Sequence, residues 1–271
     1  MCQEKEQEKQ VDLAICLLIN EEHIKRIPEF ITYHLLIGVD FFYIYYNEDD
    51  LKSGHWNQYV QPFVQAGLVD LIPFHFKTRT FNDGIQTSAY HDCLFKAKGR
   101  AKWLGYLDAD EFFQIIQPGL KFQNLKDFVN SMPKHVTSLS FKTFFYAFEG
   151  NATKYIEKSA FPSFINDWLL AKDESKNRTP KSIHRVDATD YINIHQSITK
   201  GQVIEKVDVS KVILAHFRYP YKQYTLAGLN DGSYKRFDSF KIMFGNRVLK
   251  KLGEFGFDNY HDGNNEIKFK N

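Results

Sequence analysis

The chain has 271 residues, of which 43% are hydrophobic and 16% aromatic, so it can bury a sizeable core. Its 35 basic and 33 acidic residues leave a net charge of +2, which gives no argument for a nucleic-acid partner. The cysteines Cys2, Cys16 and Cys93 have no paired spacing, which argues against a disulfide framework or a zinc motif and indicates a reducing compartment.

The two ends of the chain differ in character. Residues 1–10 are polar and are expected to form a disordered tail without the apolar core of a signal peptide. No stretch reaches the ~20 apolar residues of a membrane span. These features predict a cytoplasmic protein. Residues 236–251 are basic and apolar together, which favours a packed C-terminal helix and leaves peripheral contact with the inner membrane face as an alternative.

Apolar runs alternate with helical patterns along the first part of the chain. Strands are expected at 11–19, 39–46, 69–73 and 103–107, and helices at 24–37, 56–66 and 87–99. Such alternation is typical of right-handed crossovers between parallel strands. The fold class predicted is therefore α/β, with a mostly parallel open sheet flanked by helices.

The fourth predicted strand runs directly into three carboxylates, Asp108, Asp110 and Glu111. Because side chains alternate along a strand, Asp108 and Asp110 are expected on the same face. Neighbouring carboxylates repel unless a cation or a proton lies between them, and oxygen ligands suit Mg²⁺ or Mn²⁺. The motif therefore predicts a seat for a metal-bound diphosphate. A polar loop that closes the strand is the plain alternative.

Polar residues also follow the first two predicted strands. Asn20 and Glu21 follow the first strand, and Asp49 and Asp50 follow the second. In open parallel sheets, ligands bind beyond the carboxyl ends of the strands. The convergence of polar residues at three strand ends therefore predicts a binding site at this edge of the sheet.

The second half of the chain has less regular patterns. The sequence predicts a helix at 125–132, a strand at 136–148, a helix at 165–170, a strand at 211–215 and a helix at 221–228.

Several stretches together resemble glycosyltransferase family 92 and the related family-2-like glycosyltransferases. They are residues 15–22, 28–39, 42–47, 86–94 and 102–112, followed by 181–185, 194–195 and 216–218. The resemblance covers roughly residues 11–225. It implies a GT-A (Rossmann-like) domain with a nucleotide-sugar-binding half at 11–115 and a helical or irregular acceptor-side half at 116–225. A C-terminal helical extension at 226–271 would follow.

The resemblance also implies an activity. It implies a metal-dependent, inverting transfer of a hexose from a nucleotide sugar, with a UDP-sugar favoured, to a glycan, a lipid-linked saccharide or another hydroxyl acceptor. The cofactor would be Mn²⁺ or Mg²⁺, held by Asp108 and Asp110. His195, and after it His216, are the candidates for a third ligand. A buried, hydrogen-bonded histidine is the alternative for each.

The remaining candidates carry simpler alternatives. Lys181 and Arg185 are predicted to pair with phosphates, or else to form a solvated basic patch. Asn20 and Glu21 would face the nucleotide, although a helix cap would also explain Asn20. Asp49 and Asp50 are candidates to bind the ribose, although turn formation would also explain them. Inversion needs a general base, and the candidates for it are Asp167, Glu149 and Glu157.

Two other functions remain open from the sequence. A nucleotidyltransferase acting on sugar phosphates also uses acidic strand ends and Mg²⁺, but the first strand here ends in Asn-Glu-Glu rather than in a glycine-rich loop. A non-catalytic carbohydrate-binding protein would use the many aromatic residues as stacking platforms. A glycoside hydrolase is disfavoured, because it needs carboxylates that face each other across a sugar.

Overall fold

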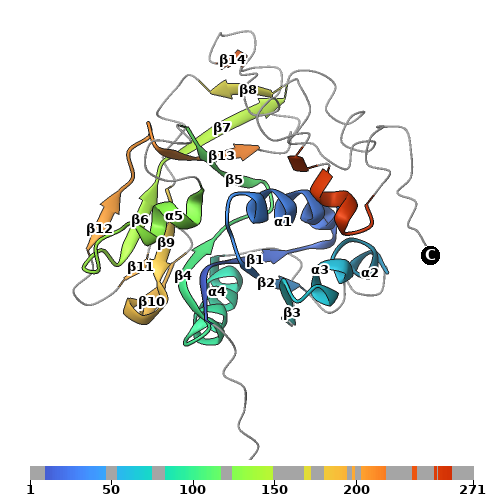
Figure 1. The fold of residues 1–271 in the computed structure, drawn as a ribbon, viewed down its shortest axis with the longest axis horizontal. Coiled ribbons are helices and arrows are strands. Elements are labelled where there is room, and N and C mark those ends of the chain that lie inside the picture. Colours follow the sequence, from blue (N-terminus) through green and yellow to red (C-terminus); the bar gives the residue numbers. More distant parts are fainter. Residues whose placement is uncertain are drawn as a thin grey trace, which may run out of the picture.

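The computed structural model describes residues 10–46, 54–74, 83–116, 124–148, 168–171, 180–193, 197–198, 203–217, 234–236, 247–248 and 250–257. Over these residues the chain forms a mixed α/β fold with two larger sheets and one short two-stranded sheet (Figure 1).

The largest sheet has seven strands in the order β12-β6-β9-β4-β1-β2-β3. Their bounds are Ile204–Lys206 (β12), Ser138–Phe141 (β6), Lys181–Arg185 (β9), Ala101–Tyr106 (β4), Val11–Ile19 (β1), Phe41–Tyr46 (β2) and Val69–Pro73 (β3). Strands β4, β1, β2 and β3 run parallel to one another, whereas β9 is antiparallel to both β4 and β6. The predicted α/β fold with a mostly parallel open sheet is confirmed.

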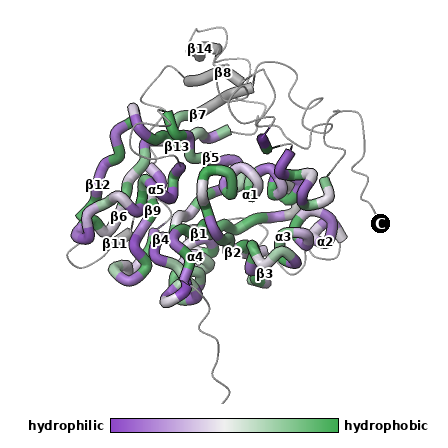
Figure 2. The backbone as a smooth tube through the Cα atoms, in the orientation of Figure 1, coloured by the Kyte–Doolittle hydropathy of each residue, from purple (hydrophilic) through white to green (hydrophobic). Residues whose placement is uncertain are grey.

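Strand β1 is buried on both faces because apolar side chains fill both of its alternating sets. Leu13, Ile15 and Leu17 belong to one buried cluster, and Ala14 and Cys16 belong to another. Helix α1 (Ile27–Leu36) contributes to the first cluster and α4 (Asp83–Ala97) to the second, so the two helices cover opposite faces of the sheet. The central strand is apolar while the edge strand β12 is largely hydrophilic (Figure 2).

The remaining helices are short. They are the 3-10 helices η1 (Glu21–Arg26) and η5 (Val186–Ala188), and the α-helices α2 (His55–Tyr59), α3 (Gln61–Gln65) and α5 (Leu125–Asn130). The helix predicted at 56–66 is divided at Val60, one residue before α3, which carries a proline in its first turn. Gly38 ends the α1 region with φ of 95°, and a Cβ there would lie 2.8 Å from Asn124 Oδ1.

A second sheet of five strands has the order β14-β8-β7-β13-β5. Its strands are Tyr234–Arg236 (β14), Trp168–Ala171 (β8), Thr143–Phe148 (β7), Val212–Phe217 (β13) and Glu111–Ile115 (β5). The strand predicted at 136–148 is divided at Lys142 into β6 and β7, which belong to different sheets. The helix predicted at 165–170 is wrong where the structure describes it, because β8 begins at Trp168.

The C-terminal part of the chain returns to the first cluster. Residues 247–248 and 250–254 are helical, and Val248 and Leu252 are buried there. Phe255 packs on Phe63 of α3, with ring centroids 4.6 Å apart. The short strands β10 (Tyr191–Ile192) and β11 (Ser197–Ile198) form the third sheet. Among the described residues, no helix has the length and apolar character that crossing a bilayer requires. The helix predicted at 221–228 and the predicted tail at 1–9 lie outside them.

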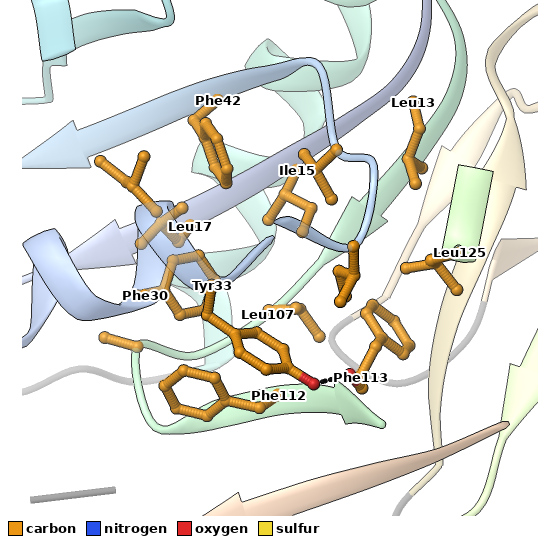
Figure 3. Packing of buried hydrophobic residues seen from close by; sticks show 14 of the residues in the cluster. Leu13, Ile15, Leu17, Phe30, Tyr33, Phe42, Leu107, Phe112, Phe113 and Leu125 are labelled. Atoms are coloured by element: carbon orange, nitrogen blue, oxygen red, sulfur yellow. Dashed lines mark hydrogen bonds between the residues drawn. The ribbon is translucent and has the colours of Figure 1, made fainter. Parts of the chain in front are cut away.

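Helix α1 also fixes the start of β5. Phe112 packs edge-on against Phe30 and Tyr33 of α1, with ring centroids 5.7 and 5.3 Å away. The Tyr33 hydroxyl donates a hydrogen bond of 2.7 Å to the carbonyl oxygen of Phe113 (Figure 3). Because Phe112 directly follows Glu111, this packing anchors the acidic residues that connect β4 to β5.

Candidate functional site

The acidic residues lie in the turn between β4 and β5, at the carboxyl end of β4. Strand β4 ends at Tyr106, and the amide of Glu111 donates a 3.0 Å hydrogen bond to the carbonyl oxygen of Asp108. Strand alternation therefore does not apply to Asp108 and Asp110, because both residues lie after the strand has ended. The two carboxylates are nevertheless close enough for the charge of Asp110 to oppose the ionisation of Asp108. Their side chains have different sets of partners. We call the segment from Asp108 to Glu111 the acidic turn.

Asp108 is held by an amide and an ammonium group. Gln86 of α4 donates a 2.9 Å hydrogen bond from Nε2 to Oδ1 of Asp108. Lys181, the first residue of β9, places Nζ 3.0 Å from Oδ2. The Asp108 side chain is 40% exposed, whereas that of Lys181 is only 3% exposed. Asp108 therefore has fixed partners on both oxygens and still reaches the surface.

Asp110 faces an imidazole and a guanidinium group. Nε2 of His216, in β13, lies 3.4 Å from Oδ1 of Asp110. Nη1 of Arg26, the last residue of η1, lies 3.9 Å from Oδ2. The Phe217 amide donates a 2.8 Å hydrogen bond to the carbonyl oxygen of Asp110. The two side-chain contacts of Asp110 are longer than those of Asp108, so the Asp110 carboxylate is the less tightly held of the two.

Glu111 contacts partners of both aspartates, namely Lys181, which holds Asp108, and His216, which faces Asp110. Its Oε2 accepts a 2.9 Å hydrogen bond from the Asp108 amide and lies 3.1 Å from Nζ of Lys181. Its Oε1 lies 3.4 Å from Nδ1 of His216. Antiparallel pairing of β5 with β13 sets His216 directly opposite Glu111. Glu111 is thus buried among the other charged groups, which agrees with a supporting role rather than that of a general base.

Burial and charge act against each other on the ionisation of these groups. Burial raises the pKa of Glu111 to about 7, because the opposing effect of Lys181 is smaller. For Asp110 the effect of burial is outweighed by His216 and Arg26, which hold its pKa well below the usual range. Burial would lower the pKa of Lys181, but Asp108 and Glu111 raise it well above its usual range. Burial likewise opposes ionisation of His216, and Asp110 outweighs it and raises that pKa.

The end of β1 lies beside the acidic turn. Asn20 precedes η1 and makes no capping hydrogen bond with its side chain. Its Oδ1 lies 2.6 Å from Nδ1 of His23. His23 is close enough to Asp110 to help lower the pKa of that carboxyl group. The helix-cap alternative for Asn20 is therefore not supported, and the ends of β1 and β4 share one electrostatic environment.

Comparison with known proteins identifies the family. The sequence profile of Glycosyltransferase family 92 matches residues 11–266. The chain belongs to this family. A family 92 protein of Ricinus communis is 23% identical over 235 residues, which cover 81% of this chain and 35% of the relative. The Caenorhabditis elegans protein named beta-1,4-galactosyltransferase galt-1 is 28% identical over 195 residues, covering 68% of this chain and 42% of the relative.

The chain therefore spans less than half the length of these two family 92 relatives. Among solved structures, the galactosyltransferase LgtC in complex with donor and acceptor sugar analogues aligns with a TM-score of 0.37 and 10% identity, covering 89% of this chain and 95% of that chain. The apo structure of the bifunctional glycosyltransferase WbbM aligns with a TM-score of 0.34 and 9% identity, covering 68% and 33%.

The structure brings some of the predicted family 92 site residues together and separates another. Asp108, Asp110, Lys181 and His216 all lie at the acidic turn. Arg185 lies elsewhere, because it pairs with Trp103 near the amino end of β4. The structure therefore does not support Arg185 as a phosphate ligand. Outside the described residues lie Asp49, Asp50, Glu149, Glu157, Asp167 and His195, and the side chain of Glu21 is not described.

Two residues of the site were not singled out from the sequence. Gln86 lies in the first turn of α4, which begins near the same edge of the sheet as the end of β4. Arg26 ends the short helix that follows β1. Arg26 lies in the segment that directly follows β1, and Gln86 lies at the start of the helix between β3 and β4. These positions near the binding edge of the sheet were the signal that could have identified the two residues.

The donor atoms of the site bear on the metal that family 92 membership implies. Within the described part of the chain, no group of three or more His, Cys, Asp or Glu side chains has a geometry that could hold a metal ion. Mg²⁺ commonly binds through one or two carboxylates and completes its shell with water and phosphate oxygens. Asp108 and Asp110 fit this second arrangement, because both are oxygen donors and Asp108 reaches the surface.

Proposed function

We propose that this chain transfers a hexose from a nucleotide sugar to a hydroxyl group of a glycan or lipid-linked saccharide, with inversion at the anomeric carbon and a UDP-sugar as the favoured donor. The observation that carries the proposal is the acidic turn at the carboxyl end of β4, in a chain of family 92. Carboxyl ends of parallel strands are where open α/β sheets bind ligands. The relative named beta-1,4-galactosyltransferase supports a hexose as the transferred group.

The nucleotide is proposed to bind beyond β1, beside the acidic turn. Asn20 lies at the end of β1, and its neighbour His23 influences the ionisation of Asp110. A nucleotide placed against Asn20 and Glu21 would thus direct its diphosphate toward Asp108 and Asp110. Asp49 and Asp50, which follow β2 in the sequence, are the candidates for the ribose hydroxyls.

Asp110 and Asp108 are proposed to hold Mn²⁺ or Mg²⁺. Such an ion would neutralise the charge that builds on the leaving diphosphate when the glycosidic bond breaks. Arg26 and His216 favour the ionised form of Asp110, which is the form able to bind a cation. Gln86 and Lys181 orient the Asp108 carboxylate. His195 remains the candidate for a further ligand, and His216 is better suited to orienting Asp110, since both of its nitrogens face carboxylates.

Inversion requires one general base that takes the proton from the acceptor hydroxyl. The proposed base is Asp167, with Glu149 and Glu157 as the other candidates. The neighbour of Asp167, Trp168, begins β8, and an indole beside a carboxylate offers a stacking surface for a sugar. Glu111 is excluded from this role because its side chain is only 2% exposed and faces Lys181 and His216.

A donor screen tests the proposal. The purified chain would be heated with UDP-, GDP-, CMP- or dTDP-sugars, each with Mn²⁺ or with EDTA. A donor at 100 times its Kd stabilises the folded state by about 2.7 kcal/mol, so a UDP-sugar with Mn²⁺ should raise the melting temperature visibly. Release of the nucleoside diphosphate in the presence of saccharide acceptors then measures transfer. If no nucleotide sugar raised the melting temperature or released nucleotide, the proposed function would be wrong.

A further inference from the structure

The ammonium group of Lys181 is enclosed by carboxylates. Its side chain is 3% exposed, and Nζ lies 3.0 Å from Asp108 Oδ2 and 3.1 Å from Glu111 Oε2. The contact with Asp108 is a hydrogen bond as well as an ion pair, and the contact with Glu111 is an ion pair. Two of the three donors of this ammonium group point to carboxylates, and the burial of the side chain leaves little room for a phosphate oxygen beside them. Lys181 is therefore committed to the protein's own acidic turn rather than to a donor phosphate.

Lys181 closes a ring of contacts across the acidic turn. Glu111 Oε2 accepts a hydrogen bond from the Asp108 amide and forms an ion pair with Lys181. Lys181 in turn reaches Asp108 Oδ2, while Gln86 holds the other oxygen of that carboxylate. The first and last residues of the acidic turn are thereby joined through one cation.

The sheet holds Lys181 in this place. Strand β9 lies between β4 and β6, and its register sets Ile183 opposite Gly105 and Lys181 opposite Phe141. Lys181 therefore begins β9 just beyond the carboxyl end of β4, beside the acidic turn. A strand paired on both edges cannot shift without breaking two ladders of hydrogen bonds, so the backbone of Lys181 is fixed before any ligand binds, and the two carboxylates hold its ammonium group.

We propose that Lys181 is a positioning residue. Its ammonium group holds the acidic turn in the conformation that binds the donor, even when no metal is bound. This role of Lys181 rests on the proposed function only in one respect, namely that the acidic turn binds the donor. Without Lys181, Asp108 Oδ2 and Glu111 Oε2 would lose the cation that they share, and neighbouring carboxylates repel unless a cation lies between them. A divalent ion could then take over the role of the missing ammonium group.

The test compares Lys181→Met with the wild type in EDTA and in excess Mn²⁺. Removing one partner of a buried ion pair should lower the melting temperature in EDTA by about 10 °C. Excess Mn²⁺ should close at least half of this gap. The matched control is Lys126→Met, which removes a partly exposed ammonium group lying 2.8 Å from Asp40 Oδ1; its smaller gap should not respond to Mn²⁺. Equal melting temperatures in EDTA, or a Lys181→Met gap that Mn²⁺ leaves unchanged, would overturn the proposal.

Metal binding gives a second readout that a purely structural role would not change. The electron paramagnetic resonance signal of free Mn²⁺ measures how much ion the protein binds in the absence of donor. Because the ammonium group competes with the ion for Asp108, Lys181→Met should bind Mn²⁺ about tenfold more tightly than the wild type. Equal or weaker binding would contradict the proposal.

A double variant keeps the test decisive if Lys181→Met does not fold. Lys181→Met combined with Glu111→Gln removes one charge of each sign, which costs less than stranding a single buried charge. It should melt closer to the wild type in EDTA than Lys181→Met does, or fold where that variant does not. A double variant less stable than Lys181→Met would refute the proposal. Wild-type transfer is measured separately, so a failed donor screen with an intact Mn²⁺ response would reject the proposed function alone.

Discussion

The basic residues at the two ends of β9 lie in different environments, one at the candidate site and the other away from it. Lys181 begins the strand and Arg185 ends it, and both fit a phosphate-binding role in the sequence. Lys181 meets Asp108 and Glu111 at the carboxyl end of β4. Arg185 lies opposite Trp103, near the amino end of the same strand. The antiparallel register thus assigns one cation to the site and the other to the scaffold.

Arg185 is held by groups that have no relation to a ligand. Its guanidinium carbon lies 4.2 Å from the centre of the Trp103 ring, a cation–π contact. Its Nε donates a 2.8 Å hydrogen bond to the carbonyl oxygen of Val136. The lesson is that charge type alone does not identify a functional cation, whereas its position along a strand relative to the binding edge does.

The largest effect is expected at the acidic end, from Asp110→Asn. The substitution keeps the shape of the side chain but removes the charge that the proposed metal needs. We expect kcat/KM for transfer to fall about 10³-fold or more, equivalent to about 4 kcal/mol of transition-state stabilisation. Steady-state kinetics with the donor found in the screen would measure this loss.

The matched control is Asp40→Asn, the same substitution at the other end of the sheet. Asp40 Oδ2 accepts hydrogen bonds from the amides of Asp12 and Leu13 near the start of β1. It should lose stability but keep its kinetic constants. Equal kinetic losses in the two variants would indicate a general effect on folding and would contradict a specific role of Asp110.

His184, which precedes Arg185 in β9, should make the stability of the chain depend on pH. His184 is buried, and burial lowers its pKa to about 3, below the ~6.5 of a free histidine. As the pH falls below about 6.5, the unfolded chain therefore binds a proton that the folded chain does not. Stability should fall by about 1.4 kcal/mol per pH unit between about pH 6 and pH 4 from this residue alone. His184→Leu should remove that part of the slope.

Urea unfolding at pH 7, 6 and 5 would measure the difference between wild type and His184→Leu. Subtracting the two slopes removes the contributions of the other titrating groups. A second buried histidine, His34 of α1, has its pKa lowered to about 3 by burial and should give a similar difference in His34→Leu. Parallel pH profiles for wild type and His184→Leu would show that His184 does not titrate in this way.

At the end of β9 that lies away from the candidate site, Arg185→Leu should lower stability and leave donor affinity unchanged. The variant loses the contact with Trp103 and the hydrogen bonds to Val136 and Met132, together worth about 2 kcal/mol. Urea unfolding would measure the loss, and the KM for the donor should stay within about twofold, a change in binding of only ~0.4 kcal/mol. A raised KM with unchanged stability would restore the phosphate role predicted from the sequence.

The parallel part of the first sheet could be predicted because its central strands β1, β2 and β4 are almost entirely buried. The apolar run at 11–19 predicted β1 with its observed bounds, and the shorter stretch at 69–73 predicted β3 with its observed bounds. The second half was harder. One run at 136–148 supplies β6 and β7 to different sheets, and β8 lies where a helix was predicted. Pairing between strands distant in sequence decides these elements, and local patterns do not record such pairing.

The candidate site could be predicted in part for a related reason. Asp108 and Asp110 follow a clear apolar strand, so their place at a strand end was visible in the sequence. His216 and Lys181 come to them through antiparallel pairing of β13 with β5 and of β9 with β4. The alternation used to place Asp108 and Asp110 on one face does not apply, because β4 ends at Tyr106 and a turn follows. Strand periodicity holds only as far as the strand continues.

The smallest effect is expected from Gln86, which supports Asp108 from the helix side. Its Nε2 donates hydrogen bonds of 2.9 Å to Asp108 Oδ1 and 2.7 Å to the Tyr90 hydroxyl. Gln86→Leu leaves Lys181 as the remaining partner of that carboxylate in this group, so Asp108 is less well oriented. We expect kcat/KM to fall about tenfold, equivalent to about 1.4 kcal/mol, with little change in melting temperature.

Gln86→Glu sharpens this last comparison, because it keeps the size of the side chain and sets a carboxylate against Asp108. Repulsion between the two acids should make its loss in kcat/KM larger than that of Gln86→Leu, and added Mn²⁺ should partly reverse it, since a cation between two carboxylates relieves their repulsion. Kinetics of both variants over a range of Mn²⁺ concentrations would measure the two effects. Full activity in both would mean that Lys181 alone suffices to orient Asp108, and the ammonium end of β9 would then carry the whole support of the acidic turn.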